Sequence, residues 1–309
     1  MMEISVIIPT IGRNSLKNAL ESVANQTYKE IETIVTDDTS EQRAKALVET
    51  FRLKYPQLKI KYVVNTRYKR GPSGNQNNGL GHANGKYITF LGDDDVLLPQ
   101  AIDKAVSIVQ EKNLDVLIAN CISNIRREKT GLSYGKSEEI SYYDFLRGKY
   151  DGDYFILVKR DLIGDDRFPE DAWGAEIVLF LKVFKRSQKI YYFDEIFKIN
   201  NCLPNINRVT LQMATYPDRQ ALNYYYLISE FYEDLLKFAP KQLWRYAVRG
   251  MYFSKLSSNN KKCLWFFKKS LVNIKLSILS LAYFCFLLIC PKKLFQCLMR
   301  GFLKNSCTL

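Results

Sequence analysis

Gly85-Lys86-Tyr87-Ile88-Thr89-Phe90-Leu91-Gly92-Asp93-Asp94-Asp95 is the segment from which the architecture of this 309-residue chain is best predicted. Residues 87–91 are aromatic, β-branched or aliphatic throughout, which predicts a buried strand. Gly92 interrupts that strand, and three adjacent carboxylates follow at its carboxyl end. Three aspartates repel one another, so their placement beside a buried strand is costly unless a cation lies among them. A divalent ion that also carries phosphate oxygens fits this set, whereas an acidic turn that caps the next helix is the simpler alternative.

Segments on both sides of that strand alternate between strand and helix patterns. Apolar runs predict strands, and helical spacing of apolar residues predicts helices. The predicted strands cover residues 4–10, 32–36, 60–64, 115–119 and 154–158, and the predicted helices cover 16–26, 41–54, 75–83 and 101–109. This alternation predicts an α/β fold with a mostly parallel central sheet flanked by helices. Because ligands bind at the carboxyl ends of such strands, the Asp37-Asp38 pair should lie near the Asp93-Asp94-Asp95 turn.

Two common phosphate-binding fingerprints are absent from the sequence. The chain has neither GxGxxG after the first strand nor GxxxxGK[ST], which argues against a nicotinamide-dependent dehydrogenase and a P-loop enzyme. A glycine-rich segment, residues 70–79, lies between the Asp37-Asp38 pair and the Asp93-Asp94-Asp95 turn. A helix that begins near Asn75 would direct its amide groups to the same edge of the sheet.

Basic and acidic residues are distributed unevenly along the chain. The 45 Lys and Arg exceed the 32 Asp and Glu by 13, and residues 241–309 contain 13 basic residues and no acidic one. Residues 1–240 are therefore neutral overall, which argues against a nucleic-acid-binding protein, because such proteins carry a basic surface on the folded domain. The basic tail indicates contact with an anionic surface.

The seven cysteines show no metal-binding spacing, and their odd number suits a reducing compartment. The amino-terminal residues lack the basic region and long apolar run of a signal peptide. We therefore expect the catalytic part to stay in the cytoplasm.

Five ordered motifs resemble those of family 2 glycosyltransferases, which have the GT-A fold. They are Ser5–Thr10, the helix end at Ser22–Tyr28, Val35–Ser40, Asn78-Gly79 and Ile88–Asp95, so the resemblance spans residues 4 to about 200. It implies a nucleotide-sugar donor, an inverting transfer, and a divalent cation, Mn²⁺ or Mg²⁺, held by a DxD motif.

The resemblance also implies roles for individual residues. The expected donor-binding residues, to which the predicted third helix adds Asn75, are Pro9, Thr10, Arg13, Asp37, Asp38, Asn75, Asp93 and Asp94. Within this set, Asp37 and Asp38 are expected to contact the base and ribose. The expected metal-binding residues are Asp93 and Asp95, of which Asp95 is the expected direct ligand.

The catalytic base implied by the resemblance is Glu176. Many family members carry a Glu-Asp pair after a glycine, whereas this chain has Gly174-Ala175-Glu176, which lacks the first acid and has glutamate in place of aspartate. A carboxylate in the first turn of a helix also stabilises that helix without any catalytic role. The sequence leaves both interpretations open.

The character of the chain changes after residue 205. We expect a catalytic domain over residues 1–205, a helical extension over 206–260 and a basic, apolar, membrane-associating tail over 261–309. Leu276–Cys290 is an uncharged run of 15 residues, shorter than the ~20 residues that a membrane-spanning helix needs. This length favours a helix that lies in the membrane interface or a shallow re-entrant hairpin, with a full span and a buried helix of a small subdomain as alternatives.

These features predict an inverting glycosyltransferase that moves a sugar from a nucleotide-sugar donor, expected to be a UDP-sugar, to a lipid-linked glycan in cell-surface polysaccharide synthesis. We expect it at the cytoplasmic face of the cell membrane. A sugar nucleotidyltransferase is one alternative, although residues 9–13 make a poor phosphate-binding loop. A non-catalytic membrane scaffold with a GT-A-like fold is another, supported only by the acid missing at Ala175.

Overall fold

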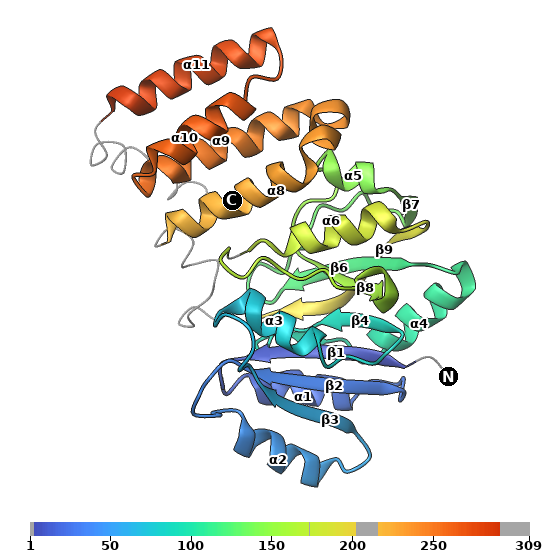
Figure 1. Ribbon diagram of the computed structural model, residues 1–309. Helices are drawn as coiled ribbons and strands as arrows, with labels where there is room; N and C mark the ends of the chain where they lie inside the picture. Colours follow the sequence, from blue (N-terminus) through green and yellow to red (C-terminus); the bar gives the residue numbers. More distant parts are fainter. Residues whose placement is uncertain (1–2, 173, 202–215, 291–309) are drawn as a thin grey trace. The chain divides into compact units, whose positions relative to one another are not determined.

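The computed structural model describes residues 3–172, 174–201 and 216–290, which belong to two compact units (Figure 1). The first unit comprises residues 1–170 and 176–206, and the second comprises residues 171–175 and 207–309. The first is a sheet with helices on both faces, and the described part of the second consists of helices and connecting turns.

One mixed sheet forms the centre of the first unit. Over the described residues its order is β3-β2-β1-β4-β8-β6-β9-β5, and β7 pairs with β9. The strands are β1 (Ile4–Thr10), β2 (Ile31–Asp37), β3 (Lys59–Val64), β4 (Tyr87–Phe90), β5 (Val96–Leu97), β6 (Val116–Ser123), β7 (Glu138–Ile140), β8 (Tyr154–Lys159) and β9 (Ile190–Asn200). β1 to β4 pair in parallel, as their alternation with helices predicts. The predicted α/β class is confirmed.

Beyond β4 the sheet contains strands of both directions. β8 lies between β4 and β6 and is antiparallel to both, with Val158 opposite Ile88 on one side and Val116 on the other. β9 is parallel to β6, with register shifts around Asn120. Strand β9 was not predicted, because the Asp194-Glu195 pair interrupts its apolar pattern at this irregularity.

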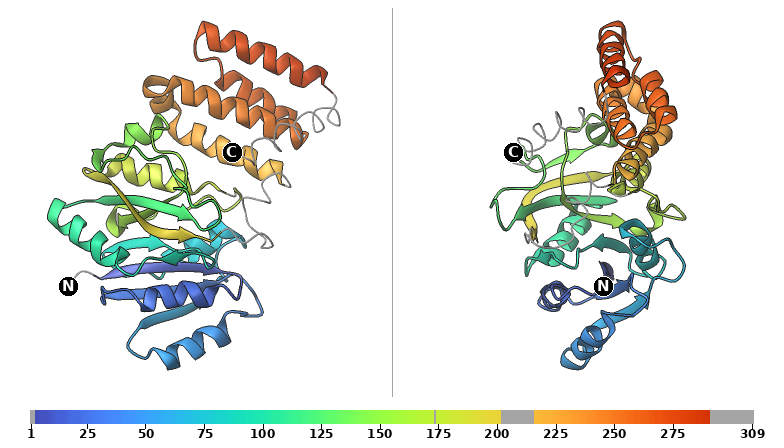
Figure 2. Two further views of the ribbon diagram at one scale, coloured as in Figure 1. Left: turned by 180° about the vertical axis from the view of Figure 1, so that it is seen from behind. Right: turned by 90° about the vertical axis from the view of Figure 1, so that its left-hand side faces the viewer.

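Helices cover both faces of the sheet (Figure 2). They are α1 (Leu16–Ala24), α2 (Lys45–Lys54), α3 (Pro72–Leu80), α4 (Ala101–Lys112), α5 (Tyr142–Leu146) and α6 (Glu176–Arg186), and a short 3₁₀ turn covers Arg160–Leu162. Apolar residues of α1, α2 and α4 share one core cluster with Ile4, Val6 and Ile8 of β1. Ile7 points to the opposite face, because side chains alternate along a strand, and there it meets α3.

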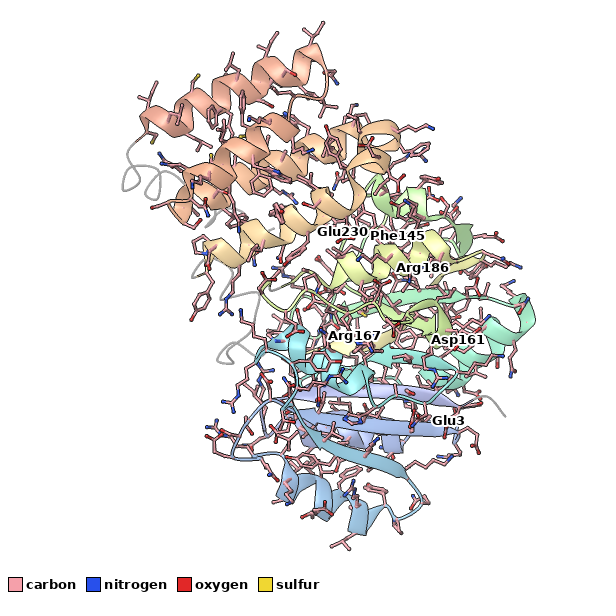
Figure 3. All side chains as sticks on the ribbon, in the orientation of Figure 1. Glu3, Phe145, Asp161, Arg167, Arg186 and Glu230 are labelled. Atoms are coloured by element: carbon pink, nitrogen blue, oxygen red, sulfur yellow. The ribbon has the colours of Figure 1, made fainter. Side chains whose placement is uncertain are left out.

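Helix α6 is fixed on the α3 side of the sheet by aromatic contacts. The Phe180 ring lies 6.5 Å from that of Phe90 at the end of β4, measured between centroids. The Phe184 ring lies 4.6 Å from that of Phe145 in α5. Arg186, the last residue of α6, pairs with Asp166; Arg186 and Phe145 are labelled in Figure 3. The middle of α6, at Phe180, therefore packs near Phe90 at the end of β4.

The second unit contains four helices among its described residues. They are α8 (Pro217–Phe238), which bends at Phe231, α9 (Pro240–Leu256), α10 (Asn260–Lys269) and α11 (Ile274–Ile289). Gly250 of α9 lets α10 approach closely, because a Cβ there would lie 2.3 Å from the ring of the fully buried Phe266. The Trp244 indole of α9 donates a hydrogen bond of 2.9 Å to the Ser280 hydroxyl of α11.

Asp171 belongs to this second unit, where it accepts a hydrogen bond of 2.8 Å from the Tyr226 hydroxyl of α8. Within the described part of the chain, none of the helices combines the length and apolar character needed to cross a bilayer.

Candidate active site

The three aspartates form a tight turn between β4 and β5. The Asp95 amide donates a hydrogen bond of 3.0 Å to the Gly92 carbonyl and closes the turn. A Cβ on Gly92 would lie 3.0 Å from a carboxylate oxygen of Asp94 and from one of Asp95. Gly92 therefore leaves room for these two carboxylates to fold back over the end of the strand.

Asp93 is buried and is held by the end of β1. The Thr10 hydroxyl donates to Asp93 Oδ2 at 2.7 Å, and the Arg13 guanidinium donates to Oδ1 at the same distance. Arg13 also lies 3.8 Å from Asp94 Oδ2. Three residues expected near the donor, Thr10, Arg13 and Asp93, thus meet in one place, next to the half-buried Pro9.

Asp95 has different partners, which come from the end of β9. Lys198 Nζ lies 3.1 Å from Asp95 Oδ2, and the Asn201 amide donates to Oδ1 at 3.2 Å. Burial lowers the pKa of Lys198, but the negative charge of Asp95 outweighs this effect and raises the pKa, so the ammonium stays protonated. Neither partner was expected from the sequence, although a lone lysine within the apolar residues 196–199 is an unusual feature of a strand.

Asp38 lies at the rim of the same edge. Its amide donates to the Thr10 carbonyl at 3.0 Å, which places it directly beside the first strand. Its carboxylate accepts hydrogen bonds from the Asn65 side chain at 2.8 Å and the Gly71 amide at 2.7 Å. Burial raises the pKa of Asp38, and these hydrogen bonds oppose the rise. The half-buried carboxylate therefore has a fixed orientation.

Asp37 and Asn75, also expected at the donor, direct their polar atoms to protein groups. The buried Asp37 carboxylate accepts hydrogen bonds from the Thr39 amide and hydroxyl, the Ala44 amide and the Tyr62 hydroxyl, all within 2.9 Å. Asn75 joins β1, β2 and α3, because its side chain bonds to Thr10 and Thr36. These bonds shape the edge on which Thr10 and Asp38 stand.

Glu176 is the first residue of α6 and is half-buried. Burial raises the pKa of this carboxyl group, and the charge of Asp153 adds to the rise. Phe180, one turn further along the same helix face, packs near Phe90. Glu176 thus starts the helix that lies beside the strand leading into the aspartate turn. Asp153, just before β8, was not expected from the sequence.

The aspartate turn fits part of a divalent-ion site. Its carboxylate oxygens are the donors that Mg²⁺ and Mn²⁺ prefer. Over the described residues, however, no three His, Cys, Asp or Glu side chains are arranged to bind one ion together. Asp93 and Asp95 could therefore supply only some of the ligands, and the others would have to come from the donor's phosphates and from water.

Comparison with known proteins identifies the family. Residues 5–162 match the family model described as glycosyl transferase family 2. A relative from Campylobacter jejuni, a GalNAc(5)-diNAcBac-PP-undecaprenol beta-1,3-glucosyltransferase, is 34% identical over 278 residues, which cover 86% of this chain and 88% of the relative. The chain belongs to glycosyltransferase family 2. The fold and the ordered motifs of the sequence agree with this assignment.

A second relative of this family 2 glycosyltransferase is an Escherichia coli enzyme, UDP-Glc:alpha-D-GlcNAc-diphosphoundecaprenol beta-1,3-glucosyltransferase. It is 25% identical over 167 residues, 54% of this chain and 64% of the relative.

Two solved structures share the fold. The S. aureus TarS fragment 1–349 in complex with UDP-GlcNAc has a TM-score of 0.61 at 17% identity, covering 88% of this chain and 90% of the fragment. The mannosyltransferase PcManGT from Pyrobaculum calidifontis, in complex with GDP-Man and Mn²⁺, has a TM-score of 0.54 at 17% identity, covering 99% of this chain and 87% of that one.

Proposed function

We propose that this family 2 glycosyltransferase moves a sugar from a UDP-sugar, with inversion, to a hydroxyl group of a lipid-linked glycan. The observation that carries the proposal is the meeting of Thr10, Arg13 and the Asp93–Asp95 turn at the carboxyl edge of the sheet, with Asp38 beside them. The names of the two bacterial relatives supply the donor and acceptor classes. Both are glucosyltransferases that act on an undecaprenol-linked saccharide, and one uses UDP-Glc.

On the donor side, Asp38 would face the nucleoside, and Arg13 would lie near the diphosphate. The Asp93 and Asp95 carboxylates would hold Mn²⁺ or Mg²⁺ together with phosphate oxygens. Such an ion neutralises the charge that grows on the leaving diphosphate. The protein's contribution is to hold these carboxylates in one orientation through Thr10, Lys198 and the Asn201 amide.

On the acceptor side, Glu176 would take the proton of the attacking hydroxyl group. The acceptor oxygen forms its bond to the anomeric carbon on the face opposite the diphosphate, the bond from that carbon to the phosphate oxygen breaks, and UDP leaves. The raised pKa of Glu176 makes its carboxylate a stronger base than an exposed glutamate.

We also infer that the enzyme works at the cytoplasmic membrane surface through α11. Leu276–Cys290 has no charged residue, and Ile274 and Ile289 at the two ends of α11 are 83% and 82% exposed. Leu271, Ile278 and Leu281 line an open apolar hollow beside them. Lys261, Lys262, Lys268 and Lys269 on neighbouring α10 supply the positive charge that attracts anionic lipids. The thiols of Cys121, Cys263 and Cys285 suit a reducing compartment.

The test is to incubate the full chain with UDP-glucose or UDP-GlcNAc, a synthetic polyprenyl-diphosphate saccharide and Mn²⁺, and to measure UDP release and the mass of the lipid product. We expect UDP release that depends on the acceptor, and a product heavier by one sugar. A non-catalytic scaffold would release no UDP. A nucleotidyltransferase would release pyrophosphate from UTP and a sugar phosphate.

A further inference from the structure

Lys198 is a buried cation at the aspartate turn, and the proposed function gives it only the task of holding the Asp95 carboxylate. Its side chain is 11% exposed and that of its partner Asp95 is 12% exposed. β5 and β9 pair antiparallel, with Leu97 opposite Lys198, so the sheet fixes both backbones a few residues from the ion pair. The contact is therefore part of the fold and not a chance meeting of two long surface side chains.

The groups around Lys198 are mostly acidic. Asp95 touches it from the β4–β5 turn, and Cys121 lies beside it in the register of β6 and β9. Asp153, just before β8, interacts with it electrostatically, as it does with Glu176.

Charge balance suggests why a cation is needed here. The turn carries three carboxylates, and Arg13 and Lys198 are cations that contact them. A donor diphosphate adds further negative charge, which grows as its bond to the sugar breaks. An ammonium group held at low exposure interacts with such an anion more strongly than one in water does.

We propose that Lys198 binds the diphosphate of the donor, and that in the absence of donor it occupies the cation position beside Asp95. This inference rests on the proposed function, because it takes a nucleoside diphosphate as the ligand. It follows that Lys198 favours UDP binding but competes with a divalent ion for Asp95. Removal of its charge should therefore change the two affinities in opposite directions.

The test compares wild type with Lys198→Met, which keeps a long side chain but removes the charge. Lys104→Met is the matched control, because Lys104 forms an exposed ion pair with Glu195. UDP affinity is measured by calorimetry with Mn²⁺ present, and the affinity for Mn²⁺ alone by electron paramagnetic resonance.

We expect Lys198→Met to weaken UDP binding by about 10- to 100-fold, the effect of one charge-assisted hydrogen bond. The same variant should bind Mn²⁺ without UDP roughly fivefold more tightly or better, because a neighbouring like charge has gone. Lys198→Arg should restore UDP binding, and Lys104→Met should match wild type in both assays. Should Lys198→Met fail to fold, Lys198→Gln, whose amide can still donate to Asp95, takes its place with the same expectations.

Equal UDP affinity in wild type and a folded charge-removing variant would overturn the role of Lys198. A parallel loss of UDP and Mn²⁺ affinity would also overturn it, because a merely structural residue acts in that way. If wild type itself binds no UDP with or without Mn²⁺, the proposed donor is wrong, which is a different result from a failure of Lys198 alone.

Discussion

Asp93 and Asp95 are two residues apart in one turn, yet their surroundings differ. Asp93 is held by Thr10 and Arg13 from β1, whereas Asp95 is held by Lys198 and the Asn201 amide from β9. Both carboxylates therefore have fixed positions before any ligand arrives. At the scale of single residues, this pre-organisation is what the proposed chemistry requires.

Asp95→Asn should lower transferase activity by about 100-fold or more, since an electrostatic group at a transition state has an effect of this size. Mn²⁺ should no longer stimulate the remaining activity of this variant. The assay is UDP release over a range of Mn²⁺ concentrations, with Asp161→Asn as the control, because Asp161 is 78% exposed. Full activity of Asp95→Asn in excess chelator would remove the metal assignment.

Glu176→Gln should keep donor affinity and lose turnover by about 10²- to 10⁴-fold, the usual contribution of a general base. The wild-type rate should fall with decreasing pH through a pKa above 4.5, because burial raises the pKa of this group and only its ionised form accepts a proton. Asp171→Asn is the comparison, since Asp171 bonds to Tyr226 in the second unit. If Asp171→Asn lost turnover and Glu176→Gln did not, the base would lie five residues earlier.

Ionisation of Glu176 should help catalysis but lower the stability of the folded protein. A carboxyl group whose pKa is higher in the folded than in the unfolded protein destabilises the fold as pH rises through the folded-state value. Glu176→Gln should therefore melt at the same temperature as wild type or higher at pH 7, and this difference should vanish below about pH 4. Thermal unfolding followed by circular dichroism at both pH values measures it. A lower melting temperature at pH 7 would show that the ionised carboxylate stabilises the fold.

At the scale of elements, the site depends on how closely α3 packs against β1 and β2. Gly79 of α3 faces the Ile7 and Thr36 side chains, and a Cβ there would lie 2.4 Å from Ile7 Cγ2 and 3.1 Å from Thr36 Cγ2. Asn75 on the same helix bonds to Thr10 and Thr36. Any outward shift of α3 would therefore disturb the strand ends that hold Asp93 and Asp38.

Gly79→Ala should destabilise the first unit by about 1–3 kcal/mol, the usual cost of overpacking, and weaken UDP binding. Gly81→Ala is the matched control, because a Cβ there meets its nearest atoms at 3.6 Å and its φ is −65°. Urea unfolding and calorimetry of both variants test the expectation. Equal stability of the two variants would mean that α3 can move away without consequence.

At the scale of the whole molecule, charge and apolar surface are unevenly distributed. The first unit carries the acidic residues of the candidate site, whereas α10 and α11 of the second unit combine lysines with exposed apolar side chains. Patches of this kind mark interaction surfaces, and a lipid surface satisfies both the charge and the apolar area.

Full-length protein should sediment with anionic vesicles, more weakly at high salt, and more weakly still with neutral ones. Ile278→Glu with Ile289→Glu should reduce binding at least 10-fold, because burial of each such side chain contributes about 1.5–3 kcal/mol. Leu53→Glu, on α2, is the control, since Leu53 is 85% exposed but lies outside this surface. Unchanged sedimentation of the double variant would exclude α11 as the contact.

The α/β class, the parallel strands β1 to β4, the aspartate turn and the family could all be predicted from the sequence. These depend on apolar periodicity and on short motifs, which are local properties of the chain. The start of α6 at Glu176 and the apolar run of α11 could be predicted for the same reason.

The groups that surround the aspartates could not be predicted from the sequence, because they come from distant parts of the chain. Lys198 meets Asp95 across 103 residues, because β9 pairs with β5, and strand pairing over such distances leaves no local pattern. Asp153, whose charge acts on Lys198 and Glu176, directly precedes β8, the strand that inserts antiparallel between β4 and β6. The carboxylate of Asp37, which the motif predicts at the donor, accepts four hydrogen bonds from protein groups within the fold. A motif specifies which side chains stand at a strand end, whereas their partners are set by long-range packing.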